Sequence, residues 1–493
     1  MFNSFYSIKP WFQQIPTGSA ALFFIQIFST SAYSVLYVTL VLFSVEALHV
    51  TATQANTMMA TFVAFNFALH LLGGYLGGRF ISFRGLFLIG MFLQTVGCLM
   101  IAQLTTHFFI LGLAVFLVGS GMDLPCINCM VTQLFTPGDK RREYAFLWNY
   151  SGMNIGFFIG VTCAGIFQAS HKFDTLFFAT SFSSIIAMTL TLFNWKKLKD
   201  VDTVLSTHID TRLARGIFAI IAIAVIVILI QYILMYALFT TEIILVLGGV
   251  MSIVITILTM TRKDKREKNK LIAFCIFAVA SLIFYTLYEL IPMALTLFLE
   301  RNVDRHIFQF LIPTPWFLNI NTIIIIFGCP LLVGIVHKLR KKGRVINIPF
   351  FFSSGLLLIG LAIVILPIGI YFAPANGFIS PVFPICTYIL LALAEISLSP
   401  IGYSIIGELS PPTLRGVLMG TWLMISGVSA ILSKIFSNLA LGEQGITSPL
   451  VSNPSYSRIF FILGISGILF GLILWLMRHI LHRLIISNNL LSG

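Results

Sequence analysis

Apolar stretches, each long enough to cross a lipid bilayer, follow one another along the whole chain. A helix needs about 20 apolar residues to span the hydrocarbon, where its backbone must satisfy its own hydrogen bonds. The chain is 58% hydrophobic and 10% charged, which is more apolar than a soluble core of this length requires. We predict an all-α polytopic membrane protein with about fourteen transmembrane helices, near residues 19–45, 53–78, 85–103, 107–135, 145–168, 174–195, 216–238, 242–260, 271–299, 309–337, 348–372, 379–407, 414–440 and 457–482.

Lysine and arginine gather in alternate connections between these stretches. The clusters Lys140–Arg142, Arg262–Lys270 and Lys338–Arg344 all fall on one predicted side, and the opposite connections hold few cations. Cytoplasmic loops carry the excess of Lys and Arg, so we predict cytoplasmic N- and C-termini and a location in the inner (plasma) membrane. This topology explains the net charge of +13 better than nucleic-acid binding does. Residues 1–17 lack the order of regions found in a cleaved signal peptide.

The apolar stretches divide into six, two and six. We predict an N-terminal six-helix bundle over 1–205, a two-helix insertion with a cytoplasmic linker over 206–270, and a C-terminal six-helix bundle over 271–493. The two inserted helices are almost uniformly apolar, so we expect them to act as a spacer outside any polar path. Cys126 and Cys129 form a C-x-x-C pair without further ligands nearby in sequence, so we interpret them as packing residues and expect no metal site and no cofactor.

Three acidic residues, Asp123, Glu289 and Glu395, each lie inside an apolar stretch. An ionisable side chain at membrane depth is costly, and it usually faces a protected cavity, a partner or a transport path. These residues therefore indicate a solute pathway through a helical membrane protein. The first stretch adds the polar residues Gln26, Ser29, Thr30 and Tyr33, which share one helix face. They either line a cavity or form hydrogen bonds between helices.

Several motifs resemble those of the proton-dependent oligopeptide transporter family, within the major facilitator superfamily. The strongest is Glu395-Ile-Ser-Leu-Ser-Pro-Ile-Gly402, followed by Met419-Gly-Thr-Trp422. Tyr150-Ser-Gly-Met-Asn154-Ile-Gly156 and Gly119-Ser-Gly-Met-Asp-Leu-Pro125 resemble motifs of the family's fifth and fourth helices. Gly73–Arg79 is similar to the superfamily's loop motif, with Gly78 where Asp is expected. The resemblance implies the major facilitator fold: two six-helix bundles around a central site, here with two extra central helices.

The chain departs from the family pattern in its N-terminal half. The family's first helix carries a Glu-x-x-Glu-Arg motif, but here Gln26, Ser29 and Thr30 occupy that stretch. The fourth-helix lysine, implicated in coupling and in binding a peptide carboxylate, is replaced by Leu124. We therefore expect proton coupling through non-standard residues, with Asp123 and Glu289 as candidates. We also expect a substrate whose amine is essential and whose carboxylate is dispensable or masked.

The resemblance assigns roles to the remaining site residues. It implies that Asn154, with Tyr150 on the same helix face, binds the substrate backbone, while Gln26, Thr30 and Tyr33 offer neutral polar groups. Glu289 would face the substrate and exchange a proton. Glu395 would bind the substrate amine. Trp422 and Ser426 share a helix face by their i, i+4 spacing, so we expect them to form the apolar wall and polar edge of a side-chain pocket. Each of these residues has a packing alternative. Asp123 has three: a replacement proton carrier, a selector of cationic substrates, or a buried structural partner, since Gly119 and Gly121 permit close helix approach.

These observations favour a secondary transporter that imports short peptides or peptide-like solutes by alternating access. No nucleotide-binding Walker motif is present in the sequence, which argues against ATP-driven transport. The alternatives are a facilitator or symporter of another small solute, and a non-transporting nutrient sensor on the same fold. A membrane enzyme is disfavoured, because no paired His and Asp or metal cluster is evident. The expected partners are the substrate, protons and lipid, and the expected state is a monomer that binds no nucleic acid.

Overall fold

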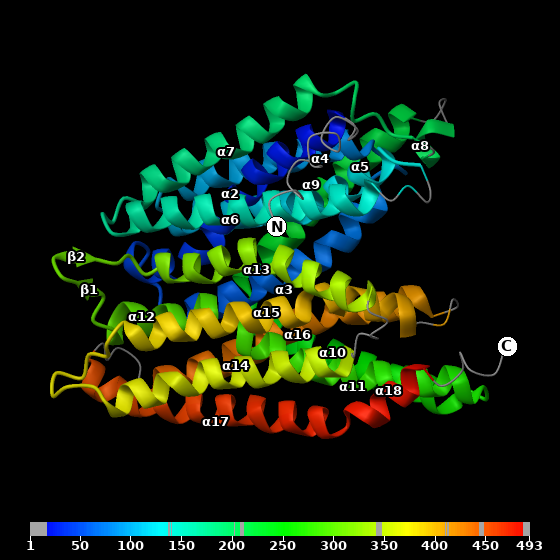
Figure 1. Cartoon of the computed structure of the whole chain (residues 1–493). Helices are drawn as coiled ribbons and strands as arrows, with labels where there is room; N and C mark the ends of the chain where they lie inside the picture. The colour runs from blue at the N-terminus through cyan, green and yellow to red at the C-terminus, as the bar shows by residue number, and fades with distance from the viewer. Residues whose placement is uncertain are drawn as a thin grey trace, which may run out of the picture. The chain divides into compact units, whose positions relative to one another are not determined.

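The computed structural model describes residues 17–136, 139, 141–201, 203–207, 212–341, 348–409, 411, 414–442 and 448–486. Within them the chain is almost entirely helical (Figure 1). The helices of its first half are α2 (Thr17–Glu46), α3 (Ala52–Leu76), α4 (Phe83–Ile101), α5 (Thr106–Gln133), α6 (Arg141–Gln168), α7 (Phe173–Phe193), α8 (Val204–Thr207), α9 (Arg212–Met235) and α10 (Ala237–Thr261).

The second half begins with α11 (Lys265–Tyr288), the π-helical turn η2 (Ile291–Leu295) and α12 (Thr296–Asn302). A two-stranded antiparallel sheet of β1 (His306–Ile307) and β2 (Phe310–Leu311) follows. The remaining elements are α13 (Trp316–Lys341), α14 (Ile348–Tyr371), α15 (Val382–Leu409), α16 (Arg415–Leu441), α17 (Pro449–Leu476) and α18 (Arg478–Ile486).

The predicted all-α membrane fold is confirmed. In the described residues, 12 helices are long and apolar enough to cross a membrane. Two further helices, α13 and α15, contain the shorter described apolar segments Trp316–Leu332 and Val382–Leu398. Of the basic clusters used to predict the topology, Lys140 and residues 342–347 lie outside the described residues.

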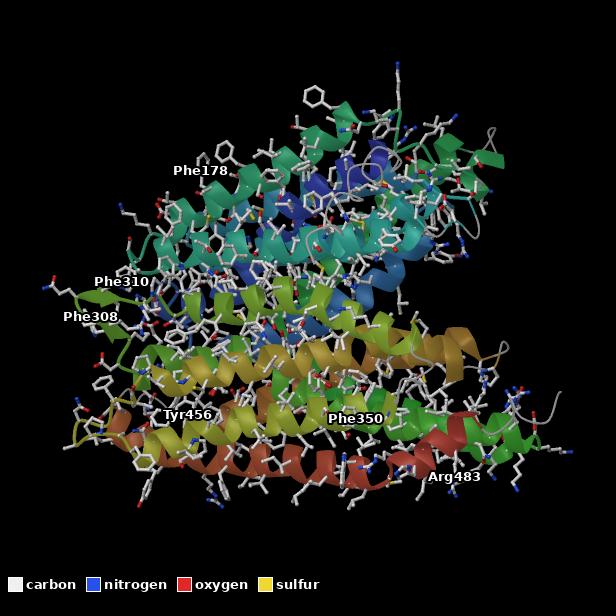
Figure 2. The ribbon with its side chains drawn as sticks, viewed as in Figure 1. Phe178, Phe308, Phe310, Phe350, Tyr456 and Arg483 are labelled. Carbon is white, nitrogen blue, oxygen red and sulfur yellow. The ribbon has the colours of Figure 1, made fainter. Side chains whose placement is uncertain are left out.

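Two predicted helix boundaries are wrong. The stretch predicted at 309–337 begins its helix only at Trp316, because His306 pairs with Leu311 and Ile307 with Phe310 in a hairpin. Figure 2 shows Phe308 and Phe310 on this hairpin. The helix predicted at 457–482 is α17 in the structure, and it begins earlier, at Pro449. A proline without an N–H fits the first helical turn. A new helix, α18, then starts at Arg478.

The stretch predicted as one helix over 271–299 is interrupted next to a candidate site residue. Helix α11 ends at Tyr288, and the π-helical turn Ile291–Leu295 contains Pro292. Proline removes one helical donor, and here the N–H of Leu295 bonds the carbonyl of Leu290 at 2.9 Å. This break lies directly after Glu289. Single π-helical turns inside α-helices are frequent at functional sites.

The chain forms two compact units, which we describe separately. Unit 1 contains residues 1–37 and 65–235, and unit 2 contains residues 38–64 and 236–493. The inserted helix α9 falls in unit 1, where it packs on α5, and α10 falls in unit 2, where it packs on α16. The predicted domain boundaries at 205 and 270 stay a prediction.

Glycines permit close helix crossings within each unit. In unit 1, a Cβ on Gly90 would lie 2.9 Å from the carbonyl oxygen of Gly119, so α4 and α5 approach with their backbones nearly in contact. In unit 2, Gly360 of α14 meets Gly464 of α17 in the same way, with a Cβ-to-oxygen distance of 2.7 Å. Small residues at such crossings are the usual means of close helix packing in membranes.

Candidate functional site

Unit 2 contains a polar cluster around Glu395, which lies on α15. The hydroxyl of Tyr288, the last residue of α11, donates a hydrogen bond of 2.6 Å to Glu395 Oε2. Asn321 of α13 lies beside the same carboxylate, although its buried Nδ2 falls short of an ordinary hydrogen bond. Three helices thus bring a carboxylate, a hydroxyl and an unused amide donor together. Residues 399–408, which complete the motif that begins at Glu395, lie outside the described side chains.

Glu289 lies one residue after the tyrosine that bonds Glu395. It is the C-terminal cap of α11, its backbone N–H bonds the carbonyl of Tyr285 at 2.9 Å, and its residue surface is 6% exposed. The π-helical turn begins two residues later, where the regular ladder of hydrogen bonds is interrupted. Both candidate carboxylates of the C-terminal half therefore belong to unit 2 and are linked through Tyr288.

The polar stripe of α2 is hydrogen-bonded within unit 1. Gln26 Nε2 donates to Thr30 Oγ1 at 2.7 Å, and Asn149 Nδ2 of α6 donates to Gln26 Oε1 at 3.0 Å. Asn149 Oδ1 is buried and has no hydrogen-bond partner. The hydrogen-bonded series from Thr30 through Gln26 to Asn149 therefore ends in an unsatisfied acceptor. The sequence analysis did not identify Asn149. The available signal was an amide inside an apolar stretch, one residue before Tyr150.

Tyr33, Tyr150 and Asn154 complete the predicted face of unit 1. Asn154 Nδ2 donates to the backbone carbonyl of Tyr150 at 2.9 Å, within α6. One amide donor is thus held by its own helix, and the carbonyl oxygen keeps its acceptor capacity. The ring of Tyr33 stacks on Tyr37, with centroids 6.0 Å apart. These residues supply neutral donors and acceptors.

Asp123 of α5 faces α4 inside unit 1. Gln94 Nε2 donates a hydrogen bond of 2.6 Å to Asp123 Oδ2. Asp123 is 8% exposed, and a Cβ on Gly90 would lie 3.3 Å from its Oδ1. Sequence reasoning missed Gln94, although a glutamine in an apolar stretch is a signal of the same kind as Asn149. The α4–α5 crossing therefore brings Asp123 to a specific amide partner.

Trp422 and Ser426 lie on α16 and are both buried. Trp422 is 2% exposed, and its ring centroid lies 6.3 Å from that of Phe274 on α11. Its indole thus packs against another helix of unit 2. The cysteines in the described residues are free, and no three His, Cys, Asp or Glu side chains of that part of the chain gather as a metal site.

Comparison with known proteins decides the family. A sequence model described as "PTR2: POT family" matches residues 79–446, well over half of the chain. The chain belongs to the POT family. The match begins after α3, so it does not include the first helix of this POT protein. The resemblance inferred from the motifs is therefore confirmed.

Curated relatives extend the match over nearly the whole POT protein. Dipeptide and tripeptide permease B of Salmonella typhimurium is 24% identical over 477 residues, covering 96% of both chains. Dipeptide and tripeptide permease A of Chromobacterium violaceum is 25% identical over 466 residues, covering 91% of this chain and 90% of the relative. This POT protein is thus a multi-pass membrane transporter and not an enzyme.

Solved structures share the fold of this POT protein. A peptide transporter POT in complex with sulfate has a TM-score of 0.82 and 22% sequence identity, covering 95% of this chain and 96% of that chain. A POT family transporter in complex with 5-aminolevulinic acid has a TM-score of 0.80 and 22% identity, covering 94% and 97%. The predicted major facilitator fold is confirmed.

Proposed function

We propose that this protein imports short peptides or peptide-like solutes by alternating access, and that protons drive the import. The observation that carries the proposal is the cluster of the half-buried Glu395 and Tyr288 with the buried Asn321 in a member of the POT family. Its curated relatives are named dipeptide and tripeptide permeases, and one structural neighbour is a complex with 5-aminolevulinic acid, an amino acid with a free amine.

The cluster fits a substrate ammonium group. Within the described residues, no Lys or Arg forms an ion pair with Glu395. A carboxylate at membrane depth without a cation is costly when ionised, and an ammonium would compensate its charge. Tyr288 and Asn321 supply neutral groups that hold the carboxylate in place while the amine binds. Trp422 and Ser426 are proposed for the side-chain end of the substrate.

Unit 1 offers neutral groups for the rest of the substrate. We assign Gln26, Thr30, Tyr33, Tyr150 and Asn154 to contacts with peptide amides. The unpartnered Oδ1 of Asn149 is a further acceptor for a substrate N–H. Because Leu124 and Thr30 stand where the family has cations, this side lacks the two charges that the family would pair with a substrate carboxylate. The proposed specificity is therefore for the amine end.

Glu289 is the first candidate for proton coupling. It is buried, lies at the break between α11 and η2, and adjoins the tyrosine that bonds Glu395. A change of backbone conformation at this break can thus change the positions of the Glu289 and Glu395 carboxylates together. Asp123 is the second candidate, since it is the buried acid of unit 1 that lies beside the position of the missing lysine.

Transport by the purified protein in proteoliposomes tests the proposal. The wild type should accumulate a labelled dipeptide when the outside is acidic, and should exchange it in counterflow without a gradient. Glu289→Gln should lose accumulation but keep counterflow, because exchange needs no net proton movement. Glu267→Gln, in the exposed region at the start of α11, is the matched control and should behave as wild type.

The outcomes separate the rival functions. Counterflow and uptake that do not respond to pH would identify a facilitator, which the missing first-helix carboxylates favour as the second candidate. Exchange of another small solute but of no peptide would overturn the substrate assignment. Absence of any exchange by well-folded, inserted protein would favour a non-transporting sensor.

We further propose that the protein acts as a monomer in the inner membrane with both termini in the cytoplasm. One solved relative is described as tetrameric, so the oligomeric state needs its own measurement. Mass determination in detergent should give a single chain. Labelling of cysteines introduced near each terminus in intact cells should fail with an impermeant reagent and succeed after lysis.

A further inference from the structure

Basic residues are concentrated in the short segment between α10 and α11. Residues 262–270 contain six Lys or Arg and two acidic residues. Both acidic residues have partners inside the segment. Asp264 caps α11 by accepting from the backbone N–H of Arg266 at 2.9 Å, and Glu267 forms an ion pair of 3.4 Å with Arg262. The segment therefore keeps a strong excess of positive charge, with Lys263, Lys265 and Arg266 exposed.

Helix α18 adds cations to the same region of unit 2. It packs on α11 and α14 through its fully buried Leu481, and Figure 1 shows it beside α11. Its basic residues include Arg478 and Arg483, and Figure 2 labels Arg483 at this end of the chain. The guanidinium of Arg478 lies 4.1 Å from the ring centroid of Trp475. Two helices that are distant in sequence thus bring their cations to one surface.

The same surface has an apolar component. Leu476 and Ile480 are exposed at the end of α17 and on α18, next to the partly exposed Trp475. A short helix with basic residues, exposed aliphatic residues and a nearby tryptophan is typical of the membrane–water interface. Counting cations in loops predicts only the orientation of the spans. The packing of α18 on α11 goes further, because it brings basic and exposed apolar residues of α17 and α18 to the helix that begins with the segment 262–270.

We propose that α18 and the segment 262–270 form a binding surface for the headgroups of anionic phospholipids. The phosphate of the lipid contacts the exposed cations of both helices, while Leu476 and Ile480 contact its acyl chains. Clusters of Lys and Arg next to a transmembrane helix recognise anionic lipids by this combination of charge and depth. The inference is independent of the transported solute, since none of these residues belongs to the proposed substrate site.

Competition between lipids on the full-length purified protein tests the surface. The protein in neutral detergent is mixed with equal amounts of phosphatidylglycerol and phosphatidylcholine, and bound lipids are counted by native mass spectrometry. The patch variant carries Lys263→Gln, Lys265→Gln and Arg483→Gln. The control variant carries Lys196→Gln, Lys197→Gln and Lys199→Gln, which remove the same charge from exposed lysines after α7 in unit 1.

We expect wild type and control variant to bind phosphatidylglycerol at least fivefold over phosphatidylcholine, and the patch variant to lose most of this preference. Equal loss in both variants, or no loss in the patch variant, would overturn the proposal. If inorganic phosphate displaces the lipid, the surface is a site for soluble anions and the lipid assignment is wrong. Wild type in about 0.5 M salt provides a test without mutation, because screening should abolish the preference.

Discussion

Gln94 Nε2 on α4 donates a 2.6 Å hydrogen bond to Asp123 Oδ2 on α5, and the other oxygen of each side chain is buried without a donor. Two acceptors remain unsatisfied as long as Asp123 is ionised. A single proton on Asp123 Oδ1 would provide the donor that an aspartate lacks. The arrangement therefore suits a neutral acid that cross-links α4 and α5 at their glycine crossing, which is the structural alternative for this residue.

Asp123→Asn should leave folding and gradient-driven accumulation close to wild type. Asparagine presents an acceptor and a donor, as the protonated acid does, so its pairing with Gln94 is preserved. Asp123→Leu should lower stability by about 1–3 kcal/mol, because Gln94 Nε2 is then buried without an acceptor. Thermal unfolding in detergent and uptake in proteoliposomes measure both effects. Loss of accumulation with intact counterflow in Asp123→Asn would instead identify Asp123 as the proton carrier.

The Tyr288–Glu395 pair predicts the polarity of substrate recognition. Peptide amides should inhibit uptake about as well as free peptides, whereas N-acetylated peptides should inhibit at least tenfold less well, about 1.4 kcal/mol. Glu395→Gln should remove this dependence on the amine. Tyr288→Phe should weaken binding of the free amine less, since it removes only the hydroxyl bonded to the carboxylate. Matched inhibition series provide the measurement.

A cation installed in unit 1 tests the other end of the substrate. Leu124→Lys should shift preference toward peptides with a free carboxylate, unless the neighbouring Asp123 neutralises the new ammonium. The double variant with Asp123→Asn removes that competition and should show the larger shift. Tenfold weaker inhibition by amidated than by free peptides in the wild type, together with no effect of acetylation, would mean that the proposed polarity is wrong.

The inserted helix α10 is attached to α16 by a buried lysine. Lys434 is 9% exposed, and its Nζ donates to Thr241 Oγ1 at 3.1 Å. Thr241→Val should destabilise unit 2 by about 1–3 kcal/mol, because a buried ammonium loses an acceptor. Adding Lys434→Met should recover most of that loss, since both polar partners are then replaced. Thr240→Val, whose hydroxyl bonds its own helix, is the matched control in thermal unfolding.

Transport by these α10 variants tests the spacer prediction. If α9 and α10 lie outside the substrate path, folded Thr241→Val protein should keep wild-type uptake per inserted molecule. Reduced uptake in that variant, with normal uptake in Thr240→Val, would show that the attachment of α10 to α16 contributes to the transport cycle.

The backbone conformation of Gly78 explains the glycine in the loop motif, and another acid, Asp200, lies at the start of α4. Gly78 has φ 72° and its carbonyl accepts from Leu205, so an aspartate there would be strained. Asp200 accepts from the N–H of Phe83 through both oxygens, each at 3.1 Å. It therefore supplies negative charge at the N-terminus of a helix.

Burial raises the pKa of Asp200 above its usual value, opposed by the Phe83 N–H and by the Arg84 charge. Asp200 is therefore protonated more readily in the folded protein than in the unfolded chain. The resulting stabilisation is present at low pH and is lost as pH rises from about 3.9, the ordinary aspartate pKa, through the raised value. As pH rises across this window, the melting temperature of the wild type should fall relative to that of Asp200→Asn. A constant difference at all pH values would contradict the assignment.

The sequence by itself determined the class, the approximate positions of the helices and the family of this protein. Long apolar stretches have to be helical in lipid, because the backbone finds no other hydrogen-bond partners there. The Glu395 motif and the Tyr150–Gly156 motif were sufficient to identify the POT family, since their residues are consecutive in the chain.

Only the tertiary structure decided which polar residues are partners. Gln26 meets Asn149, Asp123 meets Gln94, and Tyr288 meets Glu395, each from a different helix. Helical periodicity places a residue on a face, but it does not specify which distant helix packs against that face. The break after Glu289 escaped prediction for a related reason, because apolar composition is the same in an α-helix and in a π-helical turn. Close packing at glycines accompanies the Gln94–Asp123 and Gln26–Asn149 pairs, and that packing depends on residues that are distant in the chain.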